Sequence, residues 1–266
     1  MTNANTPVAL TIGGSDCSAG AGIQADLKTF SSFGVYGLSA LSCVVAETPR
    51  VVKAVYPVDP LALQTQLSLL LESYPVVAIK TGMLYSKAHI YAVCEILEQT
   101  EVPLVVDPVM VASTGDPLLT EDAVHAIRHR LCPLATILTP NLPEAGVLLN
   151  REVVTPEDQR EAAEALAERY QNYCYLKGGH LENVPEHRDL LVGKGESENL
   201  VAPHLDLKYT HGTGCTLSAA LAAGLALGYP IVKTAGMAKK FVHRALEESL
   251  HWTDISHLQQ TQKVDI

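Results

Sequence analysis

The segment Thr210-His211-Gly212-Thr213-Gly214-Cys215-Thr216 has the composition of an anion-binding turn. Its two glycines let the backbone turn so tightly that successive N–H groups point at one spot, and a small-residue helix expected over residues 217–227 adds the positive end of its dipole. Cys215 would lie in the same concavity, where a thiol or thiolate could meet a substrate hydroxyl as charge develops on a transferring phosphoryl group. The alternative is a glycine-rich turn that only caps a buried helix.

The elements that must position this turn can be read from the apolar runs. Short runs typical of strands cover residues 8–12, 38–45, 51–55, 76–79, 104–106, 136–138 and 173–176, and helical patterns lie between most of them, over residues 60–72, 87–99, 121–130, 142–149 and 156–170. Strands that alternate with helices predict a largely parallel sheet covered by helices on both faces. A hairpin over residues 189–201 is expected at the sheet edge, with its turn at residues 193–195.

Polar clusters follow nearly every expected strand. They occupy residues 13–16, 46–48, 80–83, 107–110, 139–141 and 177–180. Because the carboxyl ends of parallel strands share one edge of a sheet, these clusters should converge in space although they are far apart in the chain. The sequence therefore predicts a functional site at this edge.

Composition limits the domain count and the partners. A chain of 266 residues that is 47% hydrophobic can bury a full core, and we expect residues 1–266 to form a single domain. The 19 Lys and Arg against 29 Asp and Glu give a net charge of −10 without a basic block, which argues against nucleic-acid or anionic-membrane binding. A small-molecule partner is expected.

The cysteines and the apolar runs indicate the cellular compartment of the protein. The six cysteines are scattered without a Cys-x-x-Cys pair, and the N-terminal residues lack a basic region followed by an apolar one. This pattern argues against a disulfide framework, a zinc site and a secretory signal. No apolar run reaches the roughly 18 residues of a membrane-spanning helix, so a soluble, cytoplasmic protein is expected.

Seven motifs, in chain order, resemble those of the hydroxymethylpyrimidine/phosphomethylpyrimidine kinases of thiamine biosynthesis. They are residues 13–16, 20–30, 80–83, 107–112, 139–145, 177–180 and 211–216. That family belongs to the ribokinase-like superfamily, in which pyridoxal kinases are close relatives. The resemblance implies a three-layer α/β/α ribokinase-like fold with a mostly parallel central sheet. It also implies transfer of the γ-phosphoryl group of ATP, with Mg²⁺, to the hydroxymethyl group of a small heteroaromatic substrate, further phosphorylation of the monophosphate, and a homodimer.

The same resemblance assigns catalytic roles within the glycine turn. Gly212, Gly214 and Cys215 are expected to form an anion hole for the transferring phosphoryl group, because phosphoryl transfer depends mainly on positioning and charge stabilisation. Many ribokinase-like relatives carry an aspartate base where this chain has Cys215. A cysteine at a helix N-terminus ionises more easily than a free one and could accept the hydroxyl proton. Alternatively, Cys215 only packs, and the proton leaves with the phosphoryl oxygens.

Two acidic residues are implied as the magnesium shell. Asn141 and Glu144 lie three residues apart where a strand passes into a helix, so both face the sheet edge. Resemblance places Glu144 near Mg²⁺, acting through water, with Asp107 in the same shell. Asn141 and Glu144 could equally form a capping box, and Asp107 could stabilise an Asp-Pro turn.

The resemblance implies nucleotide contacts with the phosphates and with the adenine. Lys177, beside two glycines, offers a cation for ATP phosphates, although it could be a solvated strand-end lysine. Asn141 and Thr213 are also expected near the phosphates. The adenine should lie over the two C-terminal helices near Ala219 and Met237, which are otherwise ordinary core residues.

The resemblance implies a substrate pocket with Cys215 at its far end. Residues 113–116 are a candidate lid over this pocket, although an ordinary surface loop would have the same composition. Met83 and Val109 supply apolar faces for a flat ring, or are merely core residues. The pocket is lined by Gly14, Asp16, Ala21, Glu47, Met83 and Val109.

One residue departs from the family pattern in a way that affects specificity. Glu47 replaces the glutamine that reads the pyrimidine's amino group and ring nitrogen, and a carboxylate cannot donate to that nitrogen unless one partner is protonated. Glu47 therefore pairs with a protonated ring, indicates a different substrate such as pyridoxal, or faces solvent or Arg50. A lesser departure is Ala19, where the family usually has glycine. An idle ligand-binding protein is the remaining alternative, and the retained transfer motifs argue against it.

Overall fold

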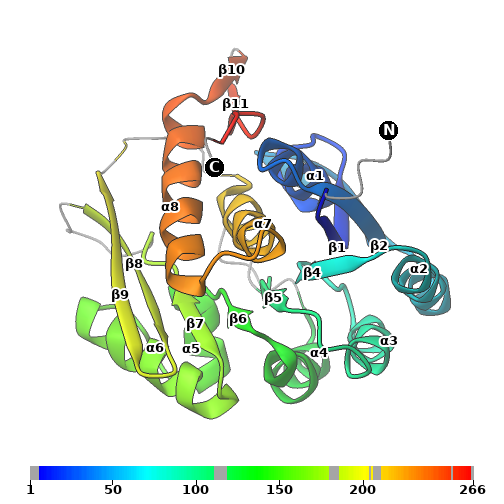
Figure 1. The fold of residues 1–266 in the computed structure, drawn as a ribbon, viewed down its shortest axis with the longest axis horizontal. Coiled ribbons are helices and arrows are strands. Elements are labelled where there is room, and N and C mark those ends of the chain that lie inside the picture. Colours follow the sequence, from blue (N-terminus) through cyan, green and yellow to red (C-terminus); the bar gives the residue numbers. More distant parts are fainter. Residues whose placement is uncertain are drawn as a thin grey trace.

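A nine-stranded sheet forms the centre of the computed structural model, which describes residues 6–110, 119–179, 186–203, 205, 211–252 and 254–264 (Figure 1). The strand order is β3-β2-β1-β4-β5-β6-β7-β8-β9. The strands from β2 to β7 in this order run parallel, whereas β3, β8 and β9 pair antiparallel with their inner neighbours. The bounds are β1 Val8–Asp16, β2 Tyr36–Thr48, β3 Val51–Pro57, β4 Val76–Thr81, β5 Leu104–Val106, β6 Ile137–Leu138, β7 Tyr173–Leu176, β8 Glu186–Gly193 and β9 Glu196–Pro203.

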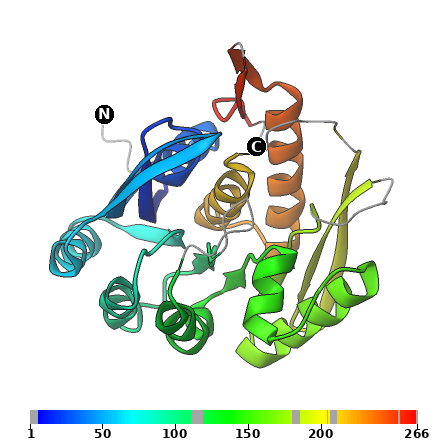
Figure 2. The same cartoon turned by 180° about the vertical axis from the view of Figure 1, so that it is seen from behind.

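Helices cover both faces of the sheet, which gives the three layers visible from opposite sides in Figures 1 and 2. One face carries α1 Gly22–Ser32, α7 Thr213–Ala226 and α8 Ile231–Glu247. The other carries α2 Pro60–Ser73, α3 Lys87–Leu97, α4 Glu121–Ala126, α5 Leu142–Leu149 and α6 Pro156–Tyr170. A π turn at Ile127–Leu131 and a 3-10 turn at Cys132–Leu134 follow α4.

The core explains why these residues form these elements. Every residue of β5, β6 and β7 is buried, as expected for parallel strands covered on both faces. Nine consecutive residues of α7, from Thr216 to Gly224, are buried, so this helix lies deep between the sheet and its neighbours. A central, buried α7 places its N-terminal turn at the carboxyl edge of the sheet, where the polar clusters gather.

The predicted three-layer fold and mostly parallel sheet are confirmed. The edge hairpin is also confirmed, and it is longer than expected because β8 and β9 pair over eight residues each. A second hairpin, β10 Leu250–Trp252 with β11 Ile255–His257, was not predicted. The expected lid at residues 113–116, together with Thr210 and His180, lies outside the described residues. Among the helices described, none combines the length and apolar character that crossing a membrane requires.

Candidate active site

The turn at the start of α7 packs backbone against backbone with the loop that precedes α1. Gly212 is the N-cap of α7 and has φ +89°, and a Cβ on it would lie 1.9 Å from the Gly20 carbonyl oxygen. Gly22, the first residue of α1, has φ +60°, and a Cβ there would lie 2.5 Å from the Gly14 carbonyl oxygen. Only glycine fits either position, so the two helix N-termini meet at one place, as an anion site requires.

Cys215 lies in the first turn of α7 and faces the start of α1. The Gly22 N–H donates a hydrogen bond to its sulfur. Burial raises the pKa of Cys215 to about 11, and the nearby Lys80 ammonium only partly opposes this rise. The expectation that this cysteine ionises more easily than a free one is therefore wrong for the unliganded protein. Desolvation of the thiolate outweighs the helix N-terminus and the lysine.

Asp107, Glu144 and Lys177 form one group, here called the nucleotide-side cluster. The Lys177 Nζ lies 3.0 Å from Asp107 Oδ1 and 3.9 Å from Glu144 Oε2, and both carboxylates are almost fully buried. Asp107 also accepts a hydrogen bond of 3.2 Å from the Ser218 hydroxyl of α7. A Cβ on Gly214 would lie 3.3 Å from the Lys177 Nζ. The predicted nucleotide and metal residues therefore converge beside the glycine turn.

The capping-box alternative for α5 is confirmed. Asn141 Oδ1 accepts from the Glu144 N–H at 2.8 Å, and Glu144 Oε2 accepts from the Asn141 N–H at 2.9 Å. The Met110 N–H donates to the other Glu144 oxygen at 3.2 Å. Burial raises the pKa of Glu144, the Lys177 charge lowers it, and the Asp107 charge raises it. Val109, adjacent to this contact, has φ +36°, a strained conformation for a β-branched residue.

Carboxylate oxygens are the ligands that Mg²⁺ prefers, and it commonly keeps several of its waters. Asp107 and Glu144 supply two buried carboxylates against one lysine, so the nucleotide-side cluster carries excess negative charge when both are ionised. Each carboxylate is already held by hydrogen bonds, so contact through metal-bound water fits this donor set better than direct capture. The residues fit a hydrated magnesium ion.

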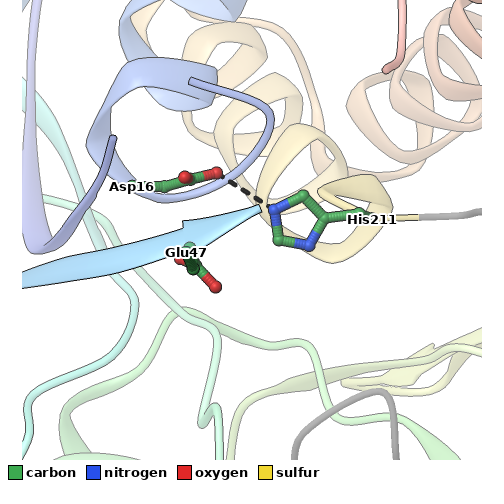
Figure 3. Close-up of side chains that lie close together, drawn as sticks. All are labelled: Asp16, Glu47 and His211. Carbon is green, nitrogen blue, oxygen red and sulfur yellow. Dashed lines mark hydrogen bonds and ion pairs between the residues drawn. The ribbon is translucent and has the colours of Figure 1, made fainter. Parts of the chain in front are cut away.

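Asp16, Glu47 and His211 form the substrate-side cluster (Figure 3), and one ligand atom from each lies within 4.8 Å of the others. Asp16 ends β1 and is 1% exposed. It accepts from the backbone N–H groups of Ser18, Gly20 and Ala21, at 2.7, 3.1 and 2.8 Å. The His211 Nε2 lies 3.0 Å away. Burial opposes ionisation of Asp16, but the hydrogen bonds from His211, Ser18 and Ala21 hold its pKa well below the usual range.

Glu47, near the end of β2, is the carboxylate of this cluster whose pKa is raised. Burial raises its pKa, the Asp16 carboxylate raises it further, and His211 opposes both. Such a triad could hold a cation, or it could present a neutral carboxylic acid to a ligand. One carboxylate oxygen of Glu47 lies within 4.8 Å of ligand atoms of Asp16 and His211, while the Arg50 guanidinium pairs with Asp254.

The other predicted pocket residues lie at the same edge. Ala21 is the N-cap of α1, Gly14 lies in β1, and Met83 follows β4 and accepts from the Ser42 hydroxyl through its carbonyl. Thr213 is the first residue of α7. Met237, on α8, packs at the margin of the core that α7 and α8 share.

A buried ion pair beneath the site was missed. Lys80 and Asp26 are fully buried and 2.7 Å apart, and the Thr11 hydroxyl donates to the same Asp26 oxygen at 2.6 Å. Burial disfavours the charged lysine, but Asp26 and other anionic groups raise its pKa overall. The signal in the sequence is a lysine at the end of an apolar strand run, which requires a buried partner.

The chain is similar in sequence and in fold to kinases of known family. Residues 16–259 match the family model described as phosphomethylpyrimidine kinase. The hydroxymethylpyrimidine/phosphomethylpyrimidine kinase of Rhizobium meliloti is 42% identical over 91% of each chain. A phosphomethylpyrimidine kinase structure from Clostridium difficile has a TM-score of 0.81 at 36% identity, covering 91% of this chain and 100% of that one. The pyridoxal kinase of Bacillus subtilis, solved as an ADP complex, has a TM-score of 0.88 at 36% identity, covering 97% and 98%.

Proposed function

The chain belongs to the phosphomethylpyrimidine kinase family, and we propose that it phosphorylates the hydroxymethyl group of 4-amino-5-hydroxymethyl-2-methylpyrimidine with ATP, and then the monophosphate to the diphosphate, in thiamine biosynthesis. The observation that carries this proposal is the meeting of the α1 and α7 N-termini at Cys215, beside Lys177. Two helix N-termini and a lysine supply the fixed positive potential that phosphoryl transfer requires.

In the transfer step, the hydroxymethyl oxygen attacks the γ-phosphorus while the bond to the β–γ bridging oxygen breaks, which releases ADP. The N–H groups at Gly212 and Gly214 hold the transferring group, while Lys177 balances charge on the nucleotide phosphates. Asn141, the N-cap of α5, and Thr213, the first residue of α7, would contact the nucleotide phosphates in this proposal. When bound, Mg²⁺ would supply charge neutralisation of those phosphates, held through water by Asp107 and Glu144.

Cys215 contacts the acceptor hydroxyl in this proposal. Its raised pKa makes the thiol the resting form, which favours release of the hydroxyl proton to a phosphoryl oxygen over capture by a thiolate. The pH dependence of kcat tests this assignment. A kcat that rises about tenfold per pH unit toward the cysteine pKa would instead identify the thiolate as the base.

A pyridoxal kinase is the second candidate function. It is favoured by Glu47, which stands where the family reads the pyrimidine with glutamine, and by the likeness to the Bacillus subtilis pyridoxal kinase. The pocket would take either ring through Gly14, Asp16, Ala21, Glu47, Met83 and Val109.

We extend the proposal to a cytoplasmic homodimer. All six cysteines are free, which suits the reducing cytosol, where disulfides are rare. The edge strand β3 exposes Val51, Val52 and Tyr56, with Val44 paired to Tyr56 on β2. An exposed apolar edge strand suits association with a second copy. Tyr56→Glu should convert a dimer to a monomer in sedimentation, and an unchanged mass would exclude this edge.

The function is tested by incubating the purified protein with ATP and Mg²⁺, giving hydroxymethylpyrimidine and pyridoxal in parallel. Mass spectrometry separates the monophosphate from the diphosphate. Dominant pyrimidine products support the proposal, dominant pyridoxal phosphate supports the second candidate, and no product with either contradicts both.

A further inference from the structure

A glutamine beyond the last predicted motif contacts both halves of the phosphoryl site. Gln260, in the segment that follows β11, is 1% exposed. Its Nε2 donates to the Gly20 carbonyl oxygen at 2.8 Å and to the Thr216 Oγ1 at 2.9 Å. Both N–H groups of the side-chain amide are therefore used, one on each side of the site.

The two acceptors belong to the two backbone segments that meet at Cys215. The Gly20 carbonyl is the atom that approaches Gly212 so closely that only glycine fits there. Thr216 donates its hydroxyl to the Gly212 carbonyl at 2.8 Å. A chain of hydrogen bonds thus runs from Gln260 through Thr216 to Gly212, while the other amide N–H holds Gly20.

The backbone around Gln260 is itself fixed. Its carbonyl accepts from the Ser32 hydroxyl at the end of α1 at 2.7 Å, and the Gln259 N–H donates to Ala245 of α8 at 3.0 Å. His257, the last residue of β11, packs against Gly20, because a Cβ on Gly20 would lie 2.2 Å from the His257 Nδ1. The glutamine amide therefore reaches the site from a rigid support.

We propose that Gln260 is a positioning residue for phosphoryl transfer, which sets the spacing between the Gly20 loop and the first turn of α7. A shift of about 1 Å between acceptor and phosphoryl donor can lower turnover about a hundredfold. Gln260 lies one residue beyond the residues that the family model matches. This inference rests on the proposed kinase activity.

Gln260→Met tests the proposal, because methionine keeps the length and volume of the side chain but donates nothing. We expect kcat to fall between about tenfold and a hundredfold, with the KM for ATP changed less than about threefold. Gln262→Met is the matched control, since Gln262 is also buried but its amide donates to Gln259 within the same segment. Gln260→Glu is the second variant, which keeps the shape and removes both N–H donors.

A readout independent of turnover is the rate at which iodoacetamide alkylates Cys215, followed by peptide mass spectrometry. We expect faster alkylation in Gln260→Met than in wild type or Gln262→Met, because the two segments around the sulfur separate. Equal kcat in wild type and both Gln260 variants, or equal losses in Gln260→Met and Gln262→Met, would overturn the proposal. An inactive wild type would contradict the kinase function instead, and unchanged alkylation would then overturn the positioning role separately.

Discussion

The nucleotide-side and substrate-side clusters contain nearly the same chemistry in two different settings. Each places two carboxylates beside one basic side chain at the N-terminal end of α7. On the nucleotide side, the base is Lys177 and both carboxylates are buried. On the substrate side, the base is His211 and the second carboxylate, Glu47, is only partly covered. The Lys177 ammonium keeps its charge through the neutral range, whereas burial and the Asp16 carboxylate raise the pKa of Glu47 and favour its neutral form.

This difference matches the proposed ligands. Nucleotide phosphates stay anionic near neutral pH, so a fixed lysine suits them. A heteroaromatic ring carries nitrogens that can bind or release a proton, so a group that can exist as a neutral acid or as a carboxylate suits the ring. We therefore expect the nucleotide-side cluster to stabilise charge and the substrate-side cluster to donate or accept a proton in hydrogen bonds to the ring.

The largest effect is expected from Lys177→Met, which leaves two buried carboxylates without a cation. The free energy of unfolding should fall by about 3–5 kcal/mol, measured by urea denaturation. Adding Asp107→Asn should recover much of that stability without restoring turnover, because the phosphates still lack their cation. Unchanged stability in the single variant would mean that the nucleotide-side cluster is less desolvated than its burial indicates.

Asp16→Asn should come next. An asparagine turns an NH₂ toward backbone N–H groups that need acceptors, so the free energy of unfolding should fall by about 2 kcal/mol at pH 7. Because the folded-state pKa of Asp16 is lowered, its contribution is present above the unfolded pKa of about 4 and is lost as the pH falls. Urea titrations at decreasing pH should therefore show the two proteins converging in stability. A constant difference would show that the carboxylate charge is not what stabilises the loop.

Glu47→Gln should have a smaller effect on stability, below about 1 kcal/mol, with its sign set by pH. Since the pKa of Glu47 is raised in the folded protein, wild-type stability should decline relative to the variant as pH rises from about 4 through that raised pKa. The charged groups facing Glu47 are Asp16 and His211, and the Glu47→Gln variant retains both of them. The KM for hydroxymethylpyrimidine should rise with pH in wild type and stay flat in Glu47→Gln. Identical pH profiles, and an identical preference between the two rings, would place Glu47 outside ring recognition.

Ala19→Gly should give the smallest change, a gain of about a few tenths of a kcal/mol, because the extra chain entropy of glycine in the unfolded state offsets much of the relief. Ala19 has φ +60° within the loop that surrounds Asp16, and an alanine there carries a Cβ penalty that glycine avoids. Gln171→Gly is the control, because Gln171 has φ +55° at the end of α6, far from the site in sequence. A gain only at residue 171 in thermal unfolding would show that the Asp16 loop has contacts that offset its strain.

The sequence predicted the fold well because its signals are local. The fully apolar runs of β5 and β7 require burial on both faces, and Asn141 with Glu144 is a capping pair that four residues define. The convergence of polar clusters then follows from parallel topology. Placing Asp107 and Lys177 together required no more than that rule, whereas Glu144 was placed by its three-residue spacing from Asn141 at the start of a helix.

What the sequence could not predict depends on distant packing. The pKa of Cys215 is raised by burial and lowered in part by Lys80, which lies on β4. The position of Cys215 at a helix N-terminus had instead predicted a lowered pKa. Gln260 lies in a segment without a helical or strand pattern, and its partner Gly20 is 240 residues away. His211 was visible only as part of a motif, and its contact with Asp16 spans 195 residues.

The close approach of Gly212 to Gly20 has a consequence for synthesis of the enzyme. The two loops come from opposite ends of the chain, so the phosphoryl site cannot assemble while the ribosome is still making the C-terminal third. Closing a loop of such length is entropically opposed until the contacts of α1 with α7 offset it. A fragment that stops just after α8 would retain all seven motifs and lack Gln260, so we expect it to turn over inefficiently. Efficient catalysis would then depend on a segment that is translated after all seven motifs.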